Sequence, residues 1–287
     1  MRQACWFMYI TGGGIFMERV LVLGGSGLVG RAIIKELDNS GSFDVYATHL
    51  SNPLPLNEDR CIKLNVDDLD GLKKVLKDIR PQRVISCIRG DFDIQLAFHK
   101  ILAEYLKENR GMLYFFSTGN VFDGDYSMPS YEDTPVCSQT DYGKFKIECE
   151  KLLKEVLGED AIIIRIPEVW GRSCPRISLL KDKLSKGERI TEYPELMVSN
   201  ITDMMIAKKL RYIMEENLEG TFHLCSEDTI SHMGFRMELL KRLGLNTDIL
   251  VEDKSEKGWF AVQSKRSNLF PKELRVTNED ILSYLTR

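Results

Sequence analysis

The sequence has 287 residues, 43% of them hydrophobic, and this length is sufficient for one large α/β domain or for a domain with a smaller lobe. Its formal net charge of −4 and the absence of a long basic run argue against a nucleic-acid partner or an anionic membrane surface. Its seven cysteines are scattered without a CxxC or Cys/His cluster, which is typical of reduced thiols in a cytoplasmic protein and indicates neither a disulfide framework nor a metal site.

The first sixteen residues, MRQACWFMYITGGGIF, do not fit the pattern of the rest of the chain. Their apolar run at 5–10 is far too short to span a bilayer, and no small-residue cleavage site of a signal peptide follows it. A second methionine, Met17, stands directly before ERVLVLGGSG, where an α/β domain would begin. We therefore interpret residues 1–16 as an extension with no part in the fold. The alternative is an additional strand or a hydrophobic contact.

Residues 17–170 alternate between short apolar strands and helices. Strands are predicted at 19–24, 43–49, 61–66, 83–88, 112–118 and 161–167. Helical spacing of apolar residues predicts helices at 27–37, 68–79 and 94–109, and a further helix from about residue 140. Strands that are apolar on both faces and separated by helices predict a doubly wound parallel sheet, which is a Rossmann-type α/β fold.

The character of the sequence changes after Pro167. Helices are predicted near 177–186, 204–216 and 232–243, and they are interrupted by one strand, GTFHLC, at 220–225. We therefore expect residues 171–287 to form mainly a smaller substrate-binding lobe, partly interleaved with the sheet.

A glycine triplet follows the first predicted strand. Gly24, Gly27 and Gly30 stand in a G-x-x-G-x-x-G frame between that strand and a helix that includes Leu28. Missing side chains allow the backbone to approach a pyrophosphate, and free N–H groups at the helix start bind its charge. The strand before and the helix after are the context that a dinucleotide site requires. The alternative is simply a tight strand-to-helix turn.

The second predicted strand bears on which dinucleotide binds. An NAD site usually has a carboxylate at the end of this strand, but here the strand ends in Thr48 and His49, and Asp44 stands at its start. Without that carboxylate a 2′-phosphate is not repelled, and Arg31 or His49 could attract it. The sequence therefore favours NADP, with NAD, or both cofactors, as the alternative.

The segment TDYGKFKIECEK at 140–151 predicts a helix on which Tyr142 and Lys146 share a face. A tyrosine has an ordinary pKa of about 10, but a nearby ammonium and an oxidised nicotinamide both favour the phenolate. The pair therefore predicts a proton donor and its modulator, and the lysine could also bind the nicotinamide ribose. The alternative is an ordinary half-buried aromatic residue.

Two hydroxyl groups stand at the end of the strand predicted at 112–118. Open α/β sheets bind ligands at this carboxyl edge, so Ser117 or Thr118 could hold the substrate oxygen. The alternative is that both only cap backbone groups at the strand end.

Several segments carry a family resemblance: GGSGLVG, FFSTGNVFDG, YGKFK, RIPEVWG and, near the C-terminus, SKRSNLF. They resemble the extended short-chain dehydrogenase/reductases, and within these the dTDP-4-dehydrorhamnose reductase branch. The resemblance implies an NADP- or NAD-dependent oxidoreductase of reductase or epimerase type that transfers hydride at C4 of a nucleotide-linked sugar. Tyr142 would be the acid and Lys146 its modulator, and Thr118 or Ser117 would contact the substrate oxygen. The family also suggests a homodimer.

The chain departs from that branch on the substrate side. Gly119 and Asn120 replace an acidic and an aromatic residue, and Glu168 aligns with a substrate-side tryptophan. Gln95 aligns with an asparagine of the preceding long helix. The segment RIP also resembles the regulatory beta subunit of methionine adenosyltransferase. The alternative function is therefore a non-catalytic, dinucleotide-binding partner protein.

Overall fold

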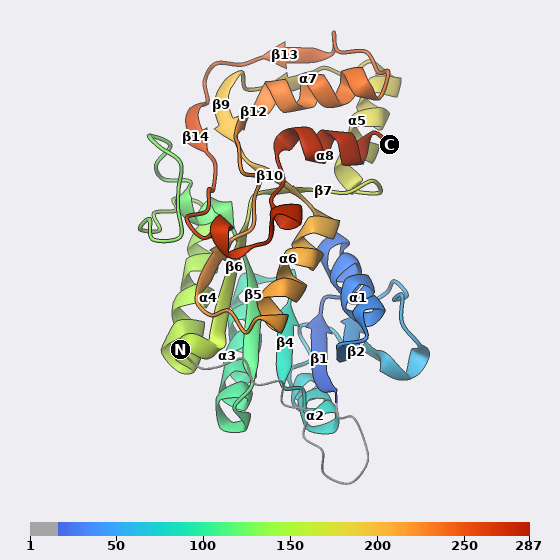
Figure 1. Cartoon of the computed structure of the whole chain (residues 1–287), viewed down its shortest axis with the longest axis vertical. Coiled ribbons are helices and arrows are strands. Elements are labelled where there is room, and N and C mark those ends of the chain that lie inside the picture. The colour runs from blue at the N-terminus through green and yellow to red at the C-terminus, as the bar shows by residue number, and fades with distance from the viewer. Residues whose placement is uncertain (1–16) are drawn as a thin grey trace. The chain divides into compact units, whose positions relative to one another are not determined.

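The computed structural model describes residues 17–287, so the interpretation of residues 1–16 as an extension lies outside the described residues. Its main element is a parallel seven-stranded sheet in the order β11-β6-β5-β4-β1-β2-β3 (Figure 1). The strands are β1 (Glu18–Leu23), β2 (Phe43–His49), β3 (Cys61–Lys63), β4 (Arg83–Ser86), β5 (Met112–Thr118), β6 (Ala161–Ile166) and β11 (Thr221–His223). Strands β2 and β3 lie on one side of β1, and β4, β5, β6 and β11 follow in that order on its other side. This order confirms the Rossmann-type prediction.

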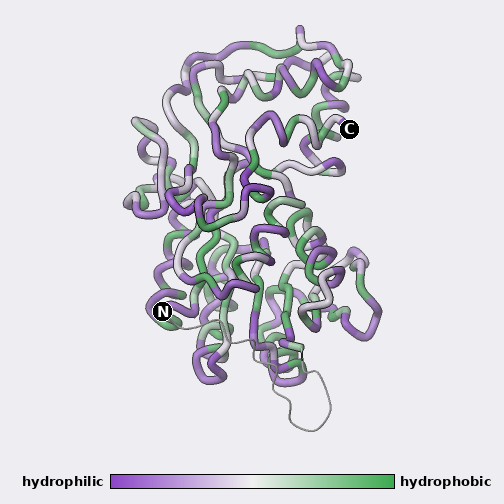
Figure 2. The backbone as a smooth tube through the Cα atoms, in the orientation of Figure 1, coloured by the Kyte–Doolittle hydropathy of each residue, from purple (hydrophilic) through white to green (hydrophobic). Residues whose placement is uncertain are grey.

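The central strands form because their apolar runs have no polar face. The side chains of β1 from Val20 to Leu23 are fully buried, as are Val84 and Ile85 of β4. A strand covered on both faces needs apolar residues at successive positions, and the continuous runs in the sequence supply them. Figure 2 shows hydrophobic residues gathered along these strands.

The helices between the strands begin and end close to their predicted limits. They are α1 (Leu28–Ser40), α2 (Leu69–Ile79), α3 (Phe92–Asn109) and α4 (Asp141–Leu157). Asp68 caps α2 by accepting the Gly71 N–H at 2.8 Å, and Asp91 caps α3 in the same way. Such capping carboxylates fix where each helix starts, and therefore where each preceding loop ends.

The C-terminal part contains more strands than the sequence indicated. Its helices are α5 (Pro175–Lys186), α6 (Asp203–Glu215), α7 (His232–Arg242) and α8 (Asn278–Leu285). The prediction of a single strand here was wrong for the described residues, because small sheets also form from β7 (Glu168–Trp170), β8 (Ile190–Glu192), β9 (Glu195–Val198), β10 (Asn200–Thr202), β12 (Ile230–Ser231), β13 (Leu250–Glu252) and β14 (Lys257–Phe260). Strands of two to four residues are too short to show a period-two pattern in the sequence.

The chain forms two compact units that alternate along the sequence. The first contains the described residues up to Phe115, with 151–162 and 210–220; the second contains 116–150, 163–209 and 221–287. The division passes through β5 and β6, whereas the predicted boundary between Rossmann domain and substrate lobe is the single position 170. The glycine triplet belongs to the first unit, and the predicted catalytic residues Ser117, Thr118, Tyr142 and Lys146 all belong to the second.

Candidate active site

The glycine turn joins β1 to α1 in the first unit. The Gly24 N–H donates to the Thr48 hydroxyl at 3.2 Å, and the Gly27 N–H donates back to Gly24 O at 3.2 Å. A Cβ on Gly30 would lie 2.5 Å from Gly24 O, so any larger residue would push the helix away from the turn. Gly27 is the N-cap of α1, and no side chain caps the helix that begins at Leu28. These residues fit a dinucleotide pyrophosphate, because an uncapped helix start favours an anion.

Arg31 connects the glycine turn to the loop that follows β2. Its Nε donates to Ser26 O at 3.1 Å and its Nη2 to Pro53 O at 2.6 Å. His49 ends β2, and its buried Nδ1 has no hydrogen-bond partner among residues 17–287. Arg31 therefore contacts the loop after β2, and His49 directly precedes that loop. No carboxylate ends the strand.

The two hydroxyl groups at the end of β5 have different partners. Ser117 is 3% exposed and donates to Glu150 Oε1 at 2.5 Å. Thr118 is partly exposed; its hydroxyl donates to Asn120 Oδ1 at 2.9 Å and accepts the Asn120 N–H at 3.2 Å. Ser117 therefore supports the interior, and Thr118 is the better placed of the two predicted hydroxyls to meet a ligand.

Helix α4 places the predicted pair near that strand end. Lys146 is 5% exposed and donates from Nζ to Phe116 O at 2.9 Å, while Tyr142, in the first turn, is 42% exposed. A Cβ on Gly143 would collide with Ser138 Oγ and lie 2.5 Å from Asn120 O. The helix start therefore packs directly against the turn η2 (Gly119–Phe122) that follows Thr118. Elements in contact thus carry Tyr142, Lys146 and Thr118, the residues predicted as the acid, its modulator and the substrate hydroxyl partner.

Asp123 fixes the approach to α4, a role that the sequence did not reveal. It accepts hydrogen bonds from the Ser138 hydroxyl at 2.8 Å, the Gln139 N–H at 2.8 Å and the Thr140 hydroxyl at 2.6 Å. Burial alone would raise the pKa of this carboxyl, but the hydrogen bonds from these three residues outweigh it and hold the pKa below its usual value. The loop therefore enters the helix along one defined path.

A buried ion pair beside the site was also missed. Glu150 and Arg165 have side chains 6% and 5% exposed, and two bonds of 3.0 and 2.7 Å join the guanidinium to both carboxylate oxygens. Arg165 Nη1 lies 3.5 Å from Nε2 of His223, and burial lowers the pKa of this histidine to about 4. Glu150 follows Lys146 by four residues, so the spacing on one helix face was a usable signal.

Two of the family departures have defined surroundings. Glu168 Oε1 accepts from Arg176 at 2.6 Å and from Arg236 at 2.8 Å, and the Arg236 guanidinium lies over the Trp170 ring. Gln95 is 3% exposed and donates to Gly90 O at 2.7 Å; its Oε1 has no partner in the described part of the chain. Glu168, which the sequence resemblance aligned with a tryptophan, therefore belongs to an ion-paired cluster.

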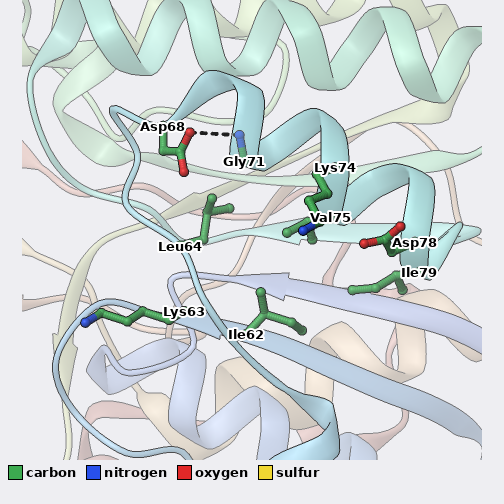
Figure 3. Close-up of a pocket in the computed structure, with 9 residues that line it drawn as sticks. All are labelled: Ile62, Lys63, Leu64, Asp68, Gly71, Lys74, Val75, Asp78 and Ile79. Atoms are coloured by element: carbon green, nitrogen blue, oxygen red, sulfur yellow. Dashed lines mark hydrogen bonds between the residues drawn. The ribbon is translucent and has the colours of Figure 1, made fainter.

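A cavity of about 310 Å³ lies elsewhere, between β3 and α2 in the first unit (Figure 3). Its lining combines apolar side chains with lysines and aspartates, and includes Ile62, Leu64, Lys63, Lys74 and Asp78. None of the sequence-predicted site residues lines this cavity. It therefore adds nothing to the assignment of the predicted site.

The described residues hold neither a candidate metal centre nor a membrane-spanning helix. Across residues 17–287, no group of three or more His, Cys, Asp or Glu side chains is arranged to hold a metal ion. No helix in that range is both long and apolar enough to cross a membrane. The buried His99 is bonded to Ser86 Oγ at 2.8 Å and to Gln95 O at 2.7 Å, which accounts for both ring nitrogens.

A family model described as RmlD substrate binding domain matches residues 17–283. Among curated proteins, methionine adenosyltransferase 2 subunit beta of Xenopus tropicalis is 26% identical over 228 residues, covering 72% of this chain. The chain spans only 66% of that relative's length. A dTDP-4-dehydrorhamnose reductase of Aggregatibacter actinomycetemcomitans is 23% identical over 246 residues, and this match covers 78% of each of the two chains.

Solved structures of similar fold span nearly the whole chain. A dTDP-4-dehydrorhamnose reductase of Clostridium acetobutylicum has a TM-score of 0.79 at 19% identity, covering 93% of this chain and 98% of its own. The Bacillus anthracis protein of the same name, in complex with NADP, has a TM-score of 0.79 at 17% identity, with coverages of 94% and 99%. A dTDP-glucose 4,6-dehydratase of Bacillus anthracis in complex with NAD scores 0.78 at 15% identity, with coverages of 94% and 95%. At these identities the likeness establishes the fold.

Proposed function

The chain belongs to the RmlD substrate binding domain family, and on this premise we propose that it is an NAD(P)-dependent oxidoreductase acting on a nucleotide-linked sugar. One observation carries the proposal: Lys146, anchored on Phe116 O, lies one helical turn from the exposed Tyr142, on a helix whose start packs against the turn after Thr118. An acid, a cation on the same helix face and a hydroxyl are the groups that carbonyl reduction at C4 requires.

The first unit would bind the cofactor. The glycine turn from Gly24 to Gly30 would bring its backbone close to a pyrophosphate, and the uncapped start of α1 would bind its charge. Arg31, held by Ser26 O and Pro53 O, would attract a 2′-phosphate, so we propose NADP in preference to NAD. When bound, the nicotinamide supplies or accepts the hydride.

The second unit would position the substrate and move the proton. Thr118 would hydrogen-bond the sugar oxygen, and Tyr142 would donate a proton to it in the reductive direction. An ammonium near a phenol favours the ionised form, so Lys146 would ease proton transfer at neutral pH. The exposure of Tyr142 suits this role, because a proton donor must reach its substrate, whereas the burial of Lys146 keeps its charge in one place.

A second candidate function is a non-catalytic, dinucleotide-binding partner protein. The specific observation in its favour is Glu168, which forms an ion-paired cluster with Arg176 and Arg236 where the branch has an aromatic residue. The likeness to a methionine adenosyltransferase beta subunit points the same way. Such a protein would bind NADPH without oxidising it.

One experiment separates the two. The purified protein is mixed with NADPH and a panel of 4-keto nucleotide sugars, and the absorbance of the reduced nicotinamide is followed. We expect oxidation by the wild type and a loss of about 10²- to 10⁴-fold in kcat for Tyr142→Phe, with NADPH affinity unchanged. Tyr46→Phe, on β2, serves as the control and should retain full activity. Tight NADPH binding without oxidation by any sugar would overturn the enzyme proposal and support the partner protein.

A further inference from the structure

We propose that the buried Glu150–Arg165 ion pair is a positioning element that holds the end of β5 where the Thr118 hydroxyl and the Lys146 amine are needed. The proposal rests on the oxidoreductase function proposed above and adds two residues that act through others. Neither side chain is a proton donor to the sugar, because each is almost completely buried and bonded to the other.

Glu150 joins α4 to two strands at once. Its Oε1 accepts the Ser117 hydroxyl at 2.5 Å and the Arg165 Nε–H at 3.0 Å, and its Oε2 accepts Arg165 Nη2–H at 2.7 Å. Glu150 lies on the same face of α4 as Tyr142 and Lys146, eight and four residues after them. The carboxylate therefore fixes the distance of that face from β5 and β6.

Arg165 also contacts the chain beyond Thr118. Its guanidinium lies 5.0 Å from the centre of the Phe122 ring, in the turn η2. Through Glu150 the ion pair holds Ser117, and through this ring contact it holds Phe122. Thr118 lies between these two points. The adjoining Phe116 O receives the Lys146 amine, so the same short segment positions both the hydroxyl and the cation.

A role in stability alone does not explain the pair well. Removing two charges from water costs about as much as their attraction returns, and apolar residues of similar volume often replace such pairs without loss. What apolar residues cannot reproduce is the directed geometry of three hydrogen bonds converging on one carboxylate. Catalysis is sensitive to such geometry, because a misplacement of about 1 Å at the reacting groups can reduce the rate about 100-fold.

The decisive variant removes the polar groups together: Ser117→Ala/Glu150→Leu/Arg165→Met. We expect a Tm near that of the wild type, NADPH affinity unchanged and kcat reduced about 10- to 100-fold. The limb of the pH–rate profile that reports the phenol should move to higher pH, because the Lys146 ammonium is then no longer fixed on the helix face that it shares with Tyr142. Glu148→Gln, an exposed glutamate on the same helix, is the matched control and should change none of these values. A triple variant with both Tm and kcat at wild-type values would overturn the proposal.

Ser117→Ala alone is the second variant, in case the triple variant does not fold. It keeps the ion pair and removes only the bond to β5. A severalfold lower kcat at unchanged Tm supports positioning, and an unchanged kcat refutes it. If none of the tested sugars causes the wild type to oxidise NADPH, the proposed oxidoreductase function has failed, and this result says nothing about the ion pair. The titration of Tyr142 by NMR, assigned with Tyr142→Phe, then decides: a midpoint raised by Ser117→Ala supports positioning, and an unmoved midpoint overturns it.

Discussion

The glycine turn of the first unit and helix α4 of the second are fixed in position by different kinds of contact. The turn is made by backbone atoms within a few residues: Gly27 bonds Gly24, and Gly30 packs against Gly24. Helix α4 depends on side chains that are distant in sequence, because its Glu150 bonds Ser117 of β5 and Arg165 of β6. A backbone turn can fail only by steric change, whereas a buried charge network can also fail through pH or loss of one partner.

The largest expected effect comes from breaking the network at one end. Arg165→Met leaves the Glu150 carboxylate buried without its cation, and such a change typically lowers the free energy of unfolding by about 3–5 kcal/mol. Chemical denaturation of the variant measures this directly. Arg189→Met, an exposed arginine of the same unit, should change stability by less than about 0.5 kcal/mol. Equal effects of the two substitutions would show that the network contributes nothing to the fold.

Acid should distinguish the same two regions. Burial lowers the pKa of His223 from 6.5 to about 4. Between these pH values the unfolded chain therefore binds a proton at this histidine and the folded chain does not. Stability therefore rises with pH between about 4 and 6.5, and the gain is on the order of 3 kcal/mol. His223→Gln should flatten the stability profile across this window. Hydrogen exchange at pH 5 should then slow in the peptides around Arg165 and leave those of the glycine turn unchanged.

The sequence predicted the parts of the molecule whose causes are local. The strand run at 19–24, the glycine spacing after it and the helical spacing of apolar residues each depend on a few neighbouring residues, so the fold and the glycine turn could be inferred. Tyr142 and Lys146 could be paired for the same reason, since helical spacing alone brings them to one face.

The remaining features depend on contacts that no local pattern contains. Either Ser117 or Thr118 could have faced a ligand, and only the bond from Ser117 to Glu150 separates them. The role of Asp123 could not be inferred, because its bonds to Ser138 and Thr140 cross more than a dozen residues. The strands β7 to β10 were missed because each is only three or four residues long, and pairing rather than composition defines them.

The glycine turn can be tested by a pair of substitutions. In Gly30→Ala the new Cβ would lie 2.5 Å from Gly24 O and 2.9 Å from Gly25 Cα, both backbone atoms, so the turn must shift. We expect a loss of about 1–3 kcal/mol in stability, together with weaker NADPH binding. In Gly27→Ala the nearest atom, Gly24 O, lies at 3.5 Å, which is ordinary contact. That variant should fold normally and lose only cofactor affinity, as titration by fluorescence would reveal.

The smallest expected effect lies at Asp123, whose hydrogen bonds hold the segment that leads into α4. Asp123→Asn keeps the shape of the side chain but removes the charge that receives the Ser138, Gln139 and Thr140 donors, so we expect a loss of about 1 kcal/mol at pH 7. Because the folded pKa of Asp123 lies below the unfolded 3.8, its stabilisation is present above that pH and is lost as the pH falls through the folded value. The variant and the wild type should therefore converge in Tm as the pH falls below the folded pKa of Asp123. Asp125→Asn, whose carboxylate bonds only within its own loop at Ser127, is the control and should leave kcat unchanged. If Asp123→Asn also left kcat unchanged, the start of α4 would be held by backbone packing around Gly143. The glycine turn and the start of α4 would then be fixed in the same way, by backbone contacts.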